Sequence, residues 1–192
     1  MDTSAGSVGW IRRPGCEELG VDPGNAPAEL DRPVPYTSDM ALGNELVARI
    51  ERTLDLYGRG RPIPATELRA RLDALGVVAD EDFAEFVGRW GGCFVGVSVH
   101  AWDNADLIGR ETCIELTTWA RDAYGALIDG VVFADDGSGN PIWIAADGSV
   151  CLVDHDNANT VVRLAASFRE LLDENVDAAA PAGNADTDAA AR

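Results

Sequence analysis

The amino-acid sequence predicts an α+β fold, in which an antiparallel β-sheet is backed by helices within a single domain. Three observations support this fold class. Apolar residues recur at helical spacing through residues 42–90, whereas short β-branched runs separated by Asp, Gly and Asn follow in the second half. The length of 192 residues, of which 46% are hydrophobic, is enough for one buried core. We therefore expect one domain with an extension at each end.

The two ends of the chain differ in composition from its middle. Residues 1–38 are rich in Gly and Pro and lack sustained periodicity, which predicts an irregular N-terminal arm. Residues 173–192 are a low-complexity Ala and Asp stretch with too few large side chains to offset the entropy of ordering. We expect this stretch to be a disordered, acidic, Ala-rich tail. The predicted α+β domain is then residues 39–172.

Three helices are predicted before any strand. The first covers residues 42–57, where apolar side chains recur at every fourth position and a glycine ends the pattern. The second covers residues 66–75. The third follows Asp80, a good N-cap with further carboxylates in the first turn, and ends at Gly91 and Gly92. Helices thus occupy the first half of the domain.

The second half of the domain contains the predicted strands. Residues 93–99 form a β-branched and apolar run typical of a strand, and a helix is expected over residues 109–124. A meander follows, because Asp-Gly between apolar runs is a strong hairpin signal. Its runs are residues 131–133, 142–144 and 150–153. A last helix is expected to begin near Thr160, and the sheet to have about four or more strands.

The charge of the chain limits its partners. The formal net charge is −18, and all fifteen cationic side chains are arginines. Nucleic acids and anionic membranes attract a positive surface, so we expect neither as a partner. No apolar run approaches the ~20 residues of a membrane-spanning helix, and the first residues lack the apolar region of a secretory signal, which predicts a cytoplasmic protein. The acidity serves either solubility or attraction of a basic partner, and both explanations stay open.

The four cysteines do not form a metal-binding or redox motif. Cys16, Cys93, Cys113 and Cys151 are widely spaced and include no C-x-x-C pair. The last three lie among apolar neighbours, where a free cysteine behaves as a small buried hydrophobe. We expect reduced thiols.

A search for catalytic residues identifies no convincing site. His155 lies between Asp154 and Asp156, as in some metal sites and carboxylate-oriented bases. Adjacent residues of a strand point to opposite faces, however, so a turn at a strand end explains the triplet better. Residues 135–140 resemble the start of a calcium loop, but Ala146 stands where a bidentate Glu is required. Without a nucleotide-binding or nucleophile motif, the sequence predicts no catalytic residue, metal or cofactor.

Trp102 is a candidate contact residue. It lies in the polar loop Ala101-Trp102-Asp103-Asn104, directly after a predicted strand, where an exposed aromatic ring can anchor a partner. Folding of the ring back over the core is an equally good explanation. The other tryptophans of the domain are expected mostly in the core.

Several short strings follow one another in a recognisable order and spacing. They are IPAT at 63–66, DEDF at 80–83, WGG at 90–92, FADDGSGN at 133–140, VDHD at 153–156 and ASFRELL at 166–172. Together they resemble the SUKH superfamily of cell-wall regulators and immunity proteins, also described as Smi/Knr-like, and the resemblance covers residues 42–172. Ala79 stands where the family often has proline, and Trp90 where asparagine often precedes the two glycines.

This resemblance implies a non-enzymatic protein-binding domain without a cofactor. The function it favours is an immunity protein, an antitoxin that neutralises a basic toxin domain of the nuclease or deaminase class by direct binding. The alternative is a regulatory scaffold that binds an endogenous partner. The charge distribution is consistent with an acidic docking face, since residues 93–172 contain twelve carboxylates but only four arginines. The residues predicted to contact the partner are Trp102, Asp103, Asp135, Asp136, Asp154, His155 and Asp156.

Overall fold

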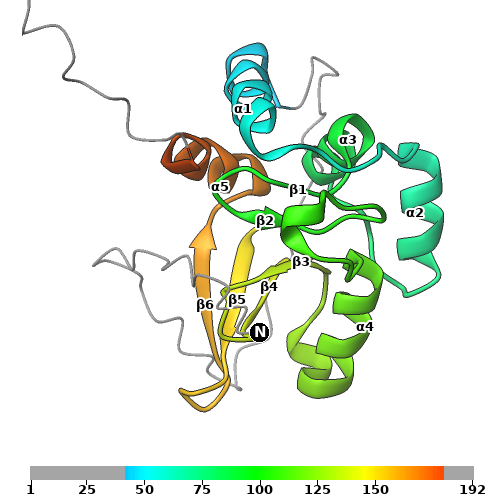
Figure 1. Ribbon diagram of the computed structural model, residues 1–192. Coiled ribbons are helices and arrows are strands. Elements are labelled where there is room, and N and C mark those ends of the chain that lie inside the picture. The colour runs from blue at the N-terminus through cyan, green and yellow to red at the C-terminus, as the bar shows by residue number, and fades with distance from the viewer. Residues whose placement is uncertain (1–41, 180–192) are drawn as a thin grey trace, which may run out of the picture.

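The computed structural model describes residues 42–179, and the predicted N-terminal arm lies outside these residues. It confirms the α+β fold class, with helices packed on both faces of a small sheet (Figure 1). The five α-helices are α1 (Asn44–Tyr57), α2 (Ala65–Asp73), α3 (Glu81–Trp90), α4 (Cys113–Tyr124) and α5 (Phe168–Asn175). Three 3₁₀ turns accompany them: η1 (Asp106–Ile108), η2 (Gly125–Leu127) and η3 (Val176–Ala179).

The main sheet is a four-stranded antiparallel meander, as predicted, with the strand order β3-β4-β5-β6. Its strands are β3 (Val131–Asp135), β4 (Pro141–Ile144), β5 (Val150–Asp154) and β6 (Thr160–Ala165). A separate pair consists of β1 (Cys93–Phe94) and β2 (Ser98–Val99). In a meander, alternate connections lie at the same end of the sheet, so the β3–β4 and β5–β6 turns are neighbours.

The prediction of a helix from Thr160 is wrong, because residues 160–165 form β6. Val153 pairs with Val161 and Leu152 with Val162, so this segment continues the meander. β-branched side chains favour the pleated surface of a sheet over a helix. The helix begins instead at Phe168, after Ser167, whose hydroxyl accepts a hydrogen bond from the Glu170 N–H.

The strand predicted at residues 93–99 is interrupted at Gly96. This glycine has a φ of +87°, and a Cβ atom there would lie 2.0 Å from the carbonyl oxygen of Asn175. The chain therefore turns back, and Phe94 pairs with Ser98. The next helix also starts later than predicted, because Thr112 forms a capping box with Glu115.

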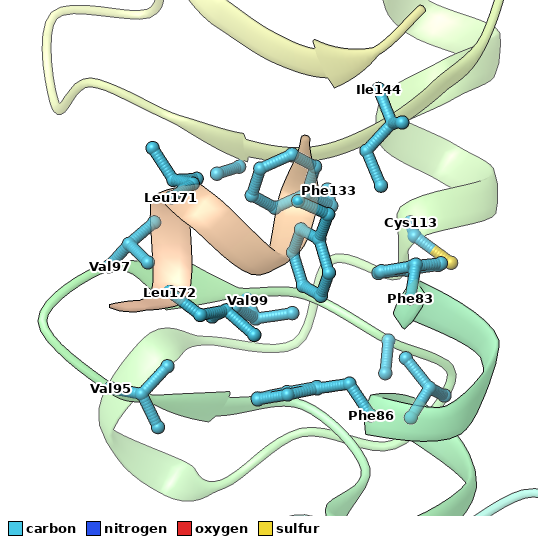
Figure 2. Close-up of a cluster of buried hydrophobic side chains, with 14 of the residues drawn as sticks. Phe83, Phe86, Val95, Val97, Val99, Cys113, Phe133, Ile144, Leu171 and Leu172 are labelled. Carbon is cyan, nitrogen blue, oxygen red and sulfur yellow. The ribbon is translucent and has the colours of Figure 1, made fainter. Parts of the chain in front are cut away.

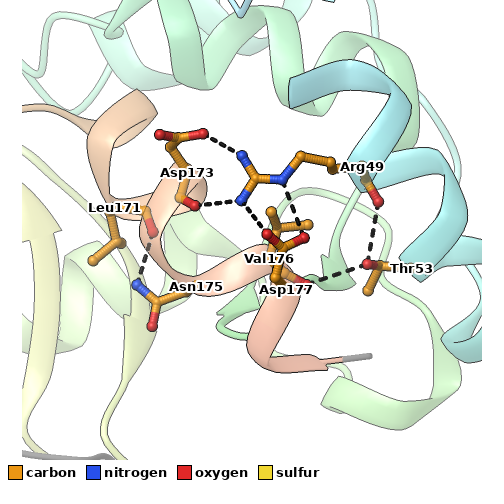
Figure 3. A network of polar contacts seen from close by, with 7 residues as sticks. All are labelled: Arg49, Thr53, Leu171, Asp173, Asn175, Val176 and Asp177. Carbon is orange, nitrogen blue, oxygen red and sulfur yellow. Dashed lines mark hydrogen bonds and ion pairs between the residues drawn. The ribbon is translucent and has the colours of Figure 1, made fainter. Parts of the chain in front are cut away.

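The last α-helix of the described residues extends past residue 172. Helix α5 continues to Asn175 and is followed by η3, in which Val176 is completely buried. The Arg49 guanidinium on α1 contacts the carboxylates of Asp173 and Asp177, with 2.7 Å between its Nη2 and the Asp177 Oδ2 (Figure 3). The Thr53 hydroxyl lies 3.4 Å from the carbonyl oxygen of Val176, to which it donates. These contacts hold the end of α5 and η3 against α1. Residues 180–192 lie outside the described residues.

The core lies between the main sheet, α3 and α5 (Figure 2). The Phe168 ring is at its centre, with ring centroids 5.2 Å from Phe133, 5.5 Å from Phe83 and 5.7 Å from Phe86, all in edge contacts. A smaller cluster on the other sheet face packs Trp143 against α4. Asp80 caps α3 as predicted, accepting a hydrogen bond from the Phe83 N–H at 3.0 Å. The core therefore supports the sheet, and the β3–β4 and β5–β6 turns project from one of its ends.

Candidate protein-binding surface

A buried asparagine joins the two neighbouring turns of the main sheet. Asn140 precedes β4 and is only 5% exposed. Its side-chain oxygen accepts a hydrogen bond from the His155 N–H at 2.9 Å, and its side-chain nitrogen donates to Asp136 Oδ2 at 2.8 Å. The β3–β4 and β5–β6 turns are thus fixed relative to each other. We call Asp135, Asp136, His155 and Asp156 on these turns the acidic turn surface.

The β3–β4 turn is built by its two aspartates. Asp136 Oδ1 accepts hydrogen bonds from the N–H groups of Ser138 and Asn140, at 2.9 and 3.1 Å. Asp135 Oδ1 accepts one from the Gly137 N–H at 2.6 Å. Side chains that mimic a turn in this way explain the sequence DDGSGN without a metal. Asp136 therefore positions the turn, and both carboxylates are held in fixed orientations.

The residues of the β5–β6 turn differ in their exposure to solvent. The Asp156 side chain is 83% exposed, and its Oδ1 lies 3.3 Å from the Nε2 atom of His155, which is 37% exposed. Asp154, by contrast, is buried at the end of β5, and its carbonyl accepts a hydrogen bond from the Asn157 N–H. The triplet Asp154-His155-Asp156 is therefore a strand end followed by a turn, as predicted. Within residues 42–179, no group of three His, Cys, Asp or Glu side chains is arranged to hold a metal.

The part of the chain that carries the acidic turn surface contains no arginine. Between Arg121 and Arg163 the sequence has seven aspartates, and His155 is its only basic side chain. Carboxylates clustered at one end of a sheet produce a negative potential there. Of the seven residues predicted to contact the partner, Asp135, Asp136, His155 and Asp156 lie on these two joined turns.

Trp102 and Asp103 lie in a second region. The Arg71 guanidinium of α2 stacks on the Trp102 ring, with 3.5 Å between its Cζ and the ring centroid. The Asp103 carboxylate pairs with Arg61, at 2.9 Å from Nη2. In Figure 1, α2 is at the right, whereas the turn between β5 and β6 is at the lower left. The structure therefore does not bring Trp102 and Asp103 into the acidic turn surface.

The loop that carries Trp102 is held by close backbone packing. Asn104 Oδ1 accepts a hydrogen bond from the Ala101 N–H, and the Gly92 N–H donates to the Asp103 carbonyl, both at 2.8 Å. A Cβ atom on Gly92 would lie 2.0 Å from Asn104 Oδ1, so only glycine fits there. The ring of Trp102 is 37% exposed. The Trp102 ring is therefore partly exposed at the surface, with one face covered by Arg71.

Sequence reasoning missed that Asn140 joins the two turns, because its hydrogen bond to the Asp136 side chain is local but its bond to His155 is not. Of the other tryptophans, which were expected mostly in the core, Trp90 and Trp143 are buried, whereas Trp119 on α4 is 47% exposed and packs edge-on against Tyr124 with 6.0 Å between ring centroids. The helical spacing of α4 indicates this exposure, since Cys113, Leu116 and Ala120 form the inward-facing stripe and Trp119 lies outside it.

Several titratable groups are buried within the described residues. Burial raises the pKa of the Cys93 and Cys113 thiols to about 12, so neither forms a nucleophilic thiolate near neutral pH. Burial also raises the pKa of Asp82 to about 6, with a further contribution from Asp80. The Asp82 Oδ1 atom has no hydrogen-bond partner among the described residues. His100 is buried too, with its Nδ1 at 2.7 Å from the Glu111 carbonyl oxygen.

Comparison with known proteins identifies the family. Residues 62–174 match the model of the SMI1 / KNR4 family (SUKH-1), and this span includes α2 to β6 and most of α5. Searches of curated proteins and of solved structures found no match. No helix in residues 42–179 is long and apolar enough to span a membrane. The family in general consists of protein-binding immunity and regulator proteins, known as non-catalytic. Because the match covers more than half of the chain, this protein belongs to the SMI1 / KNR4 family (SUKH-1).

Proposed function

We propose that this protein is a non-enzymatic, cytoplasmic immunity protein that neutralises a cognate toxin by direct binding. The toxin domain is basic and belongs to a nuclease or deaminase class. The acidic turn surface is its principal contact region. Family membership supports the general role in protein binding, and the specific partner is the part that we propose.

The observation that carries this proposal is the acidic turn surface, whose two turns are joined by Asn140 and whose stretch of sequence contains no arginine. Asn140 holds both turns in place, so little conformational entropy is lost when a partner binds them. Clustered carboxylates accelerate encounter with a basic protein, and the acceleration falls as ionic strength rises. A surface needed only for solubility would not require an asparagine that bridges its two turns.

The residues of this surface have different roles in the proposal. Asp156 is the most exposed carboxylate of this surface and contacts the partner directly, and half-buried Asp135 on the β3–β4 turn makes a second contact. Asp136 and Asn140 position the turns, and buried Asp154 supports the end of β5. Trp102 and Asp103 form a separate contact region, where the Arg71 stack presents one aromatic face in a fixed orientation.

The alternative is a regulatory scaffold for an endogenous partner, because the family includes regulators as well as immunity proteins. The identity of the neighbouring gene distinguishes the two functions. A toxin encoded next to this protein supports immunity, whereas an isolated gene supports the scaffold.

Co-expression with the polypeptide encoded by the adjacent gene tests the proposal. Rescue of growth together with co-purification of a complex is the expected result. No toxicity and no complex would contradict immunity and favour the regulatory scaffold.

Charge reversal then tests the acidic turn surface. Asp135→Arg with Asp156→Arg should weaken the complex by at least about tenfold and reduce its salt dependence. Asp55→Arg is the matched control, because Asp55 is 77% exposed on α1, away from the sheet turns. Equal affinity of the double variant and wild type would show that the partner binds elsewhere.

A further inference from the structure

The outer side of α4 carries an exposed aromatic pair. Trp119 is 47% exposed, and its ring packs edge-on against Tyr124 with 6.0 Å between ring centroids. Ala123, one turn after Trp119, is exposed as well, and Leu127 of η2 is 42% exposed. We call Trp119, Ala123, Tyr124 and Leu127 the α4 patch. A single apolar residue at a surface is ordinary, but paired aromatic rings are typical of the centre of a protein-binding site.

Hydrogen bonds fix the orientation of this patch. On the inner side of α4, Thr117 Oγ1 accepts a hydrogen bond from the Val132 N–H of β3 at 2.9 Å. The Arg121 guanidinium donates to the backbone carbonyl of Leu75. Rotation of α4 to bury Trp119 would break these hydrogen bonds, so the ring stays at the surface of the free protein. A ring held in one place loses little conformational entropy when a partner covers it.

Carboxylates flank the α4 patch. Glu115 lies four positions before Trp119 and Asp122 three positions after it, so both are on the same side of the helix as the ring. Both are exposed. Arg121 is the only arginine in residues 113–127, and its guanidinium donates to two backbone carbonyls. The patch therefore has an apolar centre and an acidic rim, and it fits a partner that has an apolar pocket with a basic rim.

A second copy of the chain does not meet this requirement. In a two-fold pair of α4 helices centred on Trp119, antiparallel packing would place Glu115 of one copy opposite Asp122 of the other. Parallel packing would place each carboxylate opposite its own equivalent. Because like charges across an interface oppose binding, charge complementarity favours a basic partner over a second copy.

The acidic turn surface and the α4 patch complement each other chemically. The turn carboxylates accelerate the encounter with a basic partner, but clustered charges contribute less to affinity than buried aromatic rings do. β3 connects the two surfaces, because Val132 bonds to α4 and Asp135 ends the strand three residues later, about 10 Å away. An interface of standard size, about 800 Å² per partner, can reach both surfaces.

We propose that the α4 patch is a second docking surface for the basic toxin domain, with Trp119 inserted into an apolar pocket of that partner. Glu115 and Asp122 pair with Lys or Arg side chains around the pocket. This inference rests on the proposed function, because the partner is the same toxin domain. The turn carboxylates then govern the association rate, and Trp119 governs the dissociation rate.

Binding kinetics with the polypeptide encoded by the adjacent gene test this inference. Trp119→Ala should raise the dissociation rate at least about tenfold and leave the salt dependence of association unchanged. Leu56→Ala is the matched control, because Leu56 is 56% exposed on α1, which is at the top of Figure 1, whereas α4 is at the lower right. The control should dissociate as slowly as the wild type. Asp122→Arg keeps the ring but reverses a rim charge, and it should also weaken the complex at least about tenfold.

Three results would overturn the inference. Trp119→Ala could dissociate as slowly as the wild type, or Leu56→Ala could dissociate as fast as Trp119→Ala. Asp122→Arg could leave the affinity unchanged, which would show that the Trp119 ring serves only the packing of α4.

Failure of the proposed function gives a different result. The wild-type protein would then form no complex with this polypeptide, and the inference would fail with the proposed function. Weakening by Trp119→Ala but not by Asp135→Arg with Asp156→Arg would support the α4 patch and contradict the acidic turn surface.

Discussion

The backbone N–H of His155 donates a hydrogen bond to the side-chain oxygen of Asn140, at a distance of 2.9 Å. Fifteen positions separate these residues, and the bond links two turns that the chain forms independently. Because Asn140 is buried and also donates to Asp136, its removal leaves polar groups on both turns without a partner.

Asn140→Ala should therefore lower both the stability of the fold and the affinity for a partner. Loss of the two Asn140 side-chain hydrogen bonds, to the His155 N–H and to Asp136, should cost about 1–3 kcal/mol in the free energy of unfolding, measurable by urea denaturation. Asn157→Ala is the control, since Asn157 is exposed in the same pair of turns. Equal unfolding midpoints for the two variants would contradict a bridging role for Asn140.

Arg49→Ala should loosen α1 from the C-terminal end of the domain. The guanidinium donates to the side chains of Asp173 and Asp177 and, at 2.6 Å, to the Asp173 carbonyl. Because both aspartates are largely exposed, we expect a loss of about 1 kcal/mol, with faster amide exchange in α1 and η3. Arg52→Ala removes an exposed arginine from the same helix and should change neither quantity. Unchanged exchange in Arg49→Ala would show that apolar packing alone holds α1.

Asp82→Asn should stabilise the protein at neutral pH but not at acidic pH. The folded-state pKa of Asp82 is about 6, above its ordinary value of 3.8, so the folded protein binds this proton more tightly than the unfolded chain. Stability is therefore lost as the pH rises from about 4 through 6. The asparagine variant avoids this loss and should gain about 1–2 kcal/mol at pH 7, after allowance for the favourable dipole of α3.

Urea denaturation of both proteins at pH 4 and pH 7 measures this difference. Glu81→Asn is the control, because Glu81 is exposed in the same helical turn. A gain in Asp82→Asn that does not depend on pH would show that desolvation of the carboxylate is not its cause.

Gly92→Ala should be strongly destabilising, although glycine to alanine is a small change. The new methyl group would lie 2.0 Å from Asn104 Oδ1, and relief of this clash displaces the loop that carries Trp102. A cost of about 2–4 kcal/mol in the free energy of unfolding is expected. Gly88→Ala in α3 meets nothing closer than 3.6 Å and should stabilise the protein by about 0.5–1 kcal/mol. Similar unfolding midpoints for the two variants would contradict the close packing at Gly92.

Local interactions explain which parts of the fold were predictable from sequence. The three N-terminal helices, the Asp80 cap and the hairpin turns depend on residues a few positions apart, and these predictions are confirmed. The segment 160–165 was mispredicted because its apolar residues fit a helical stripe as well as a strand. Hydrogen-bond pairing with β5 decides between helix and strand, and the sequence of residues 160–165 alone does not show which segment it will pair with.

The candidate protein-binding surface was likewise predictable from sequence only in part. By itself, the sequence determined the α+β class, the turn chemistry of Asp135 and Asp136, and the acidity of the second half of the domain. Only the tertiary structure decided that Asn140 joins two turns, that Trp102 stacks on Arg71, and that these features lie in separate regions. The physical reason is that composition and short-range geometry act along the chain, whereas these contacts join residues that only the packed core brings together.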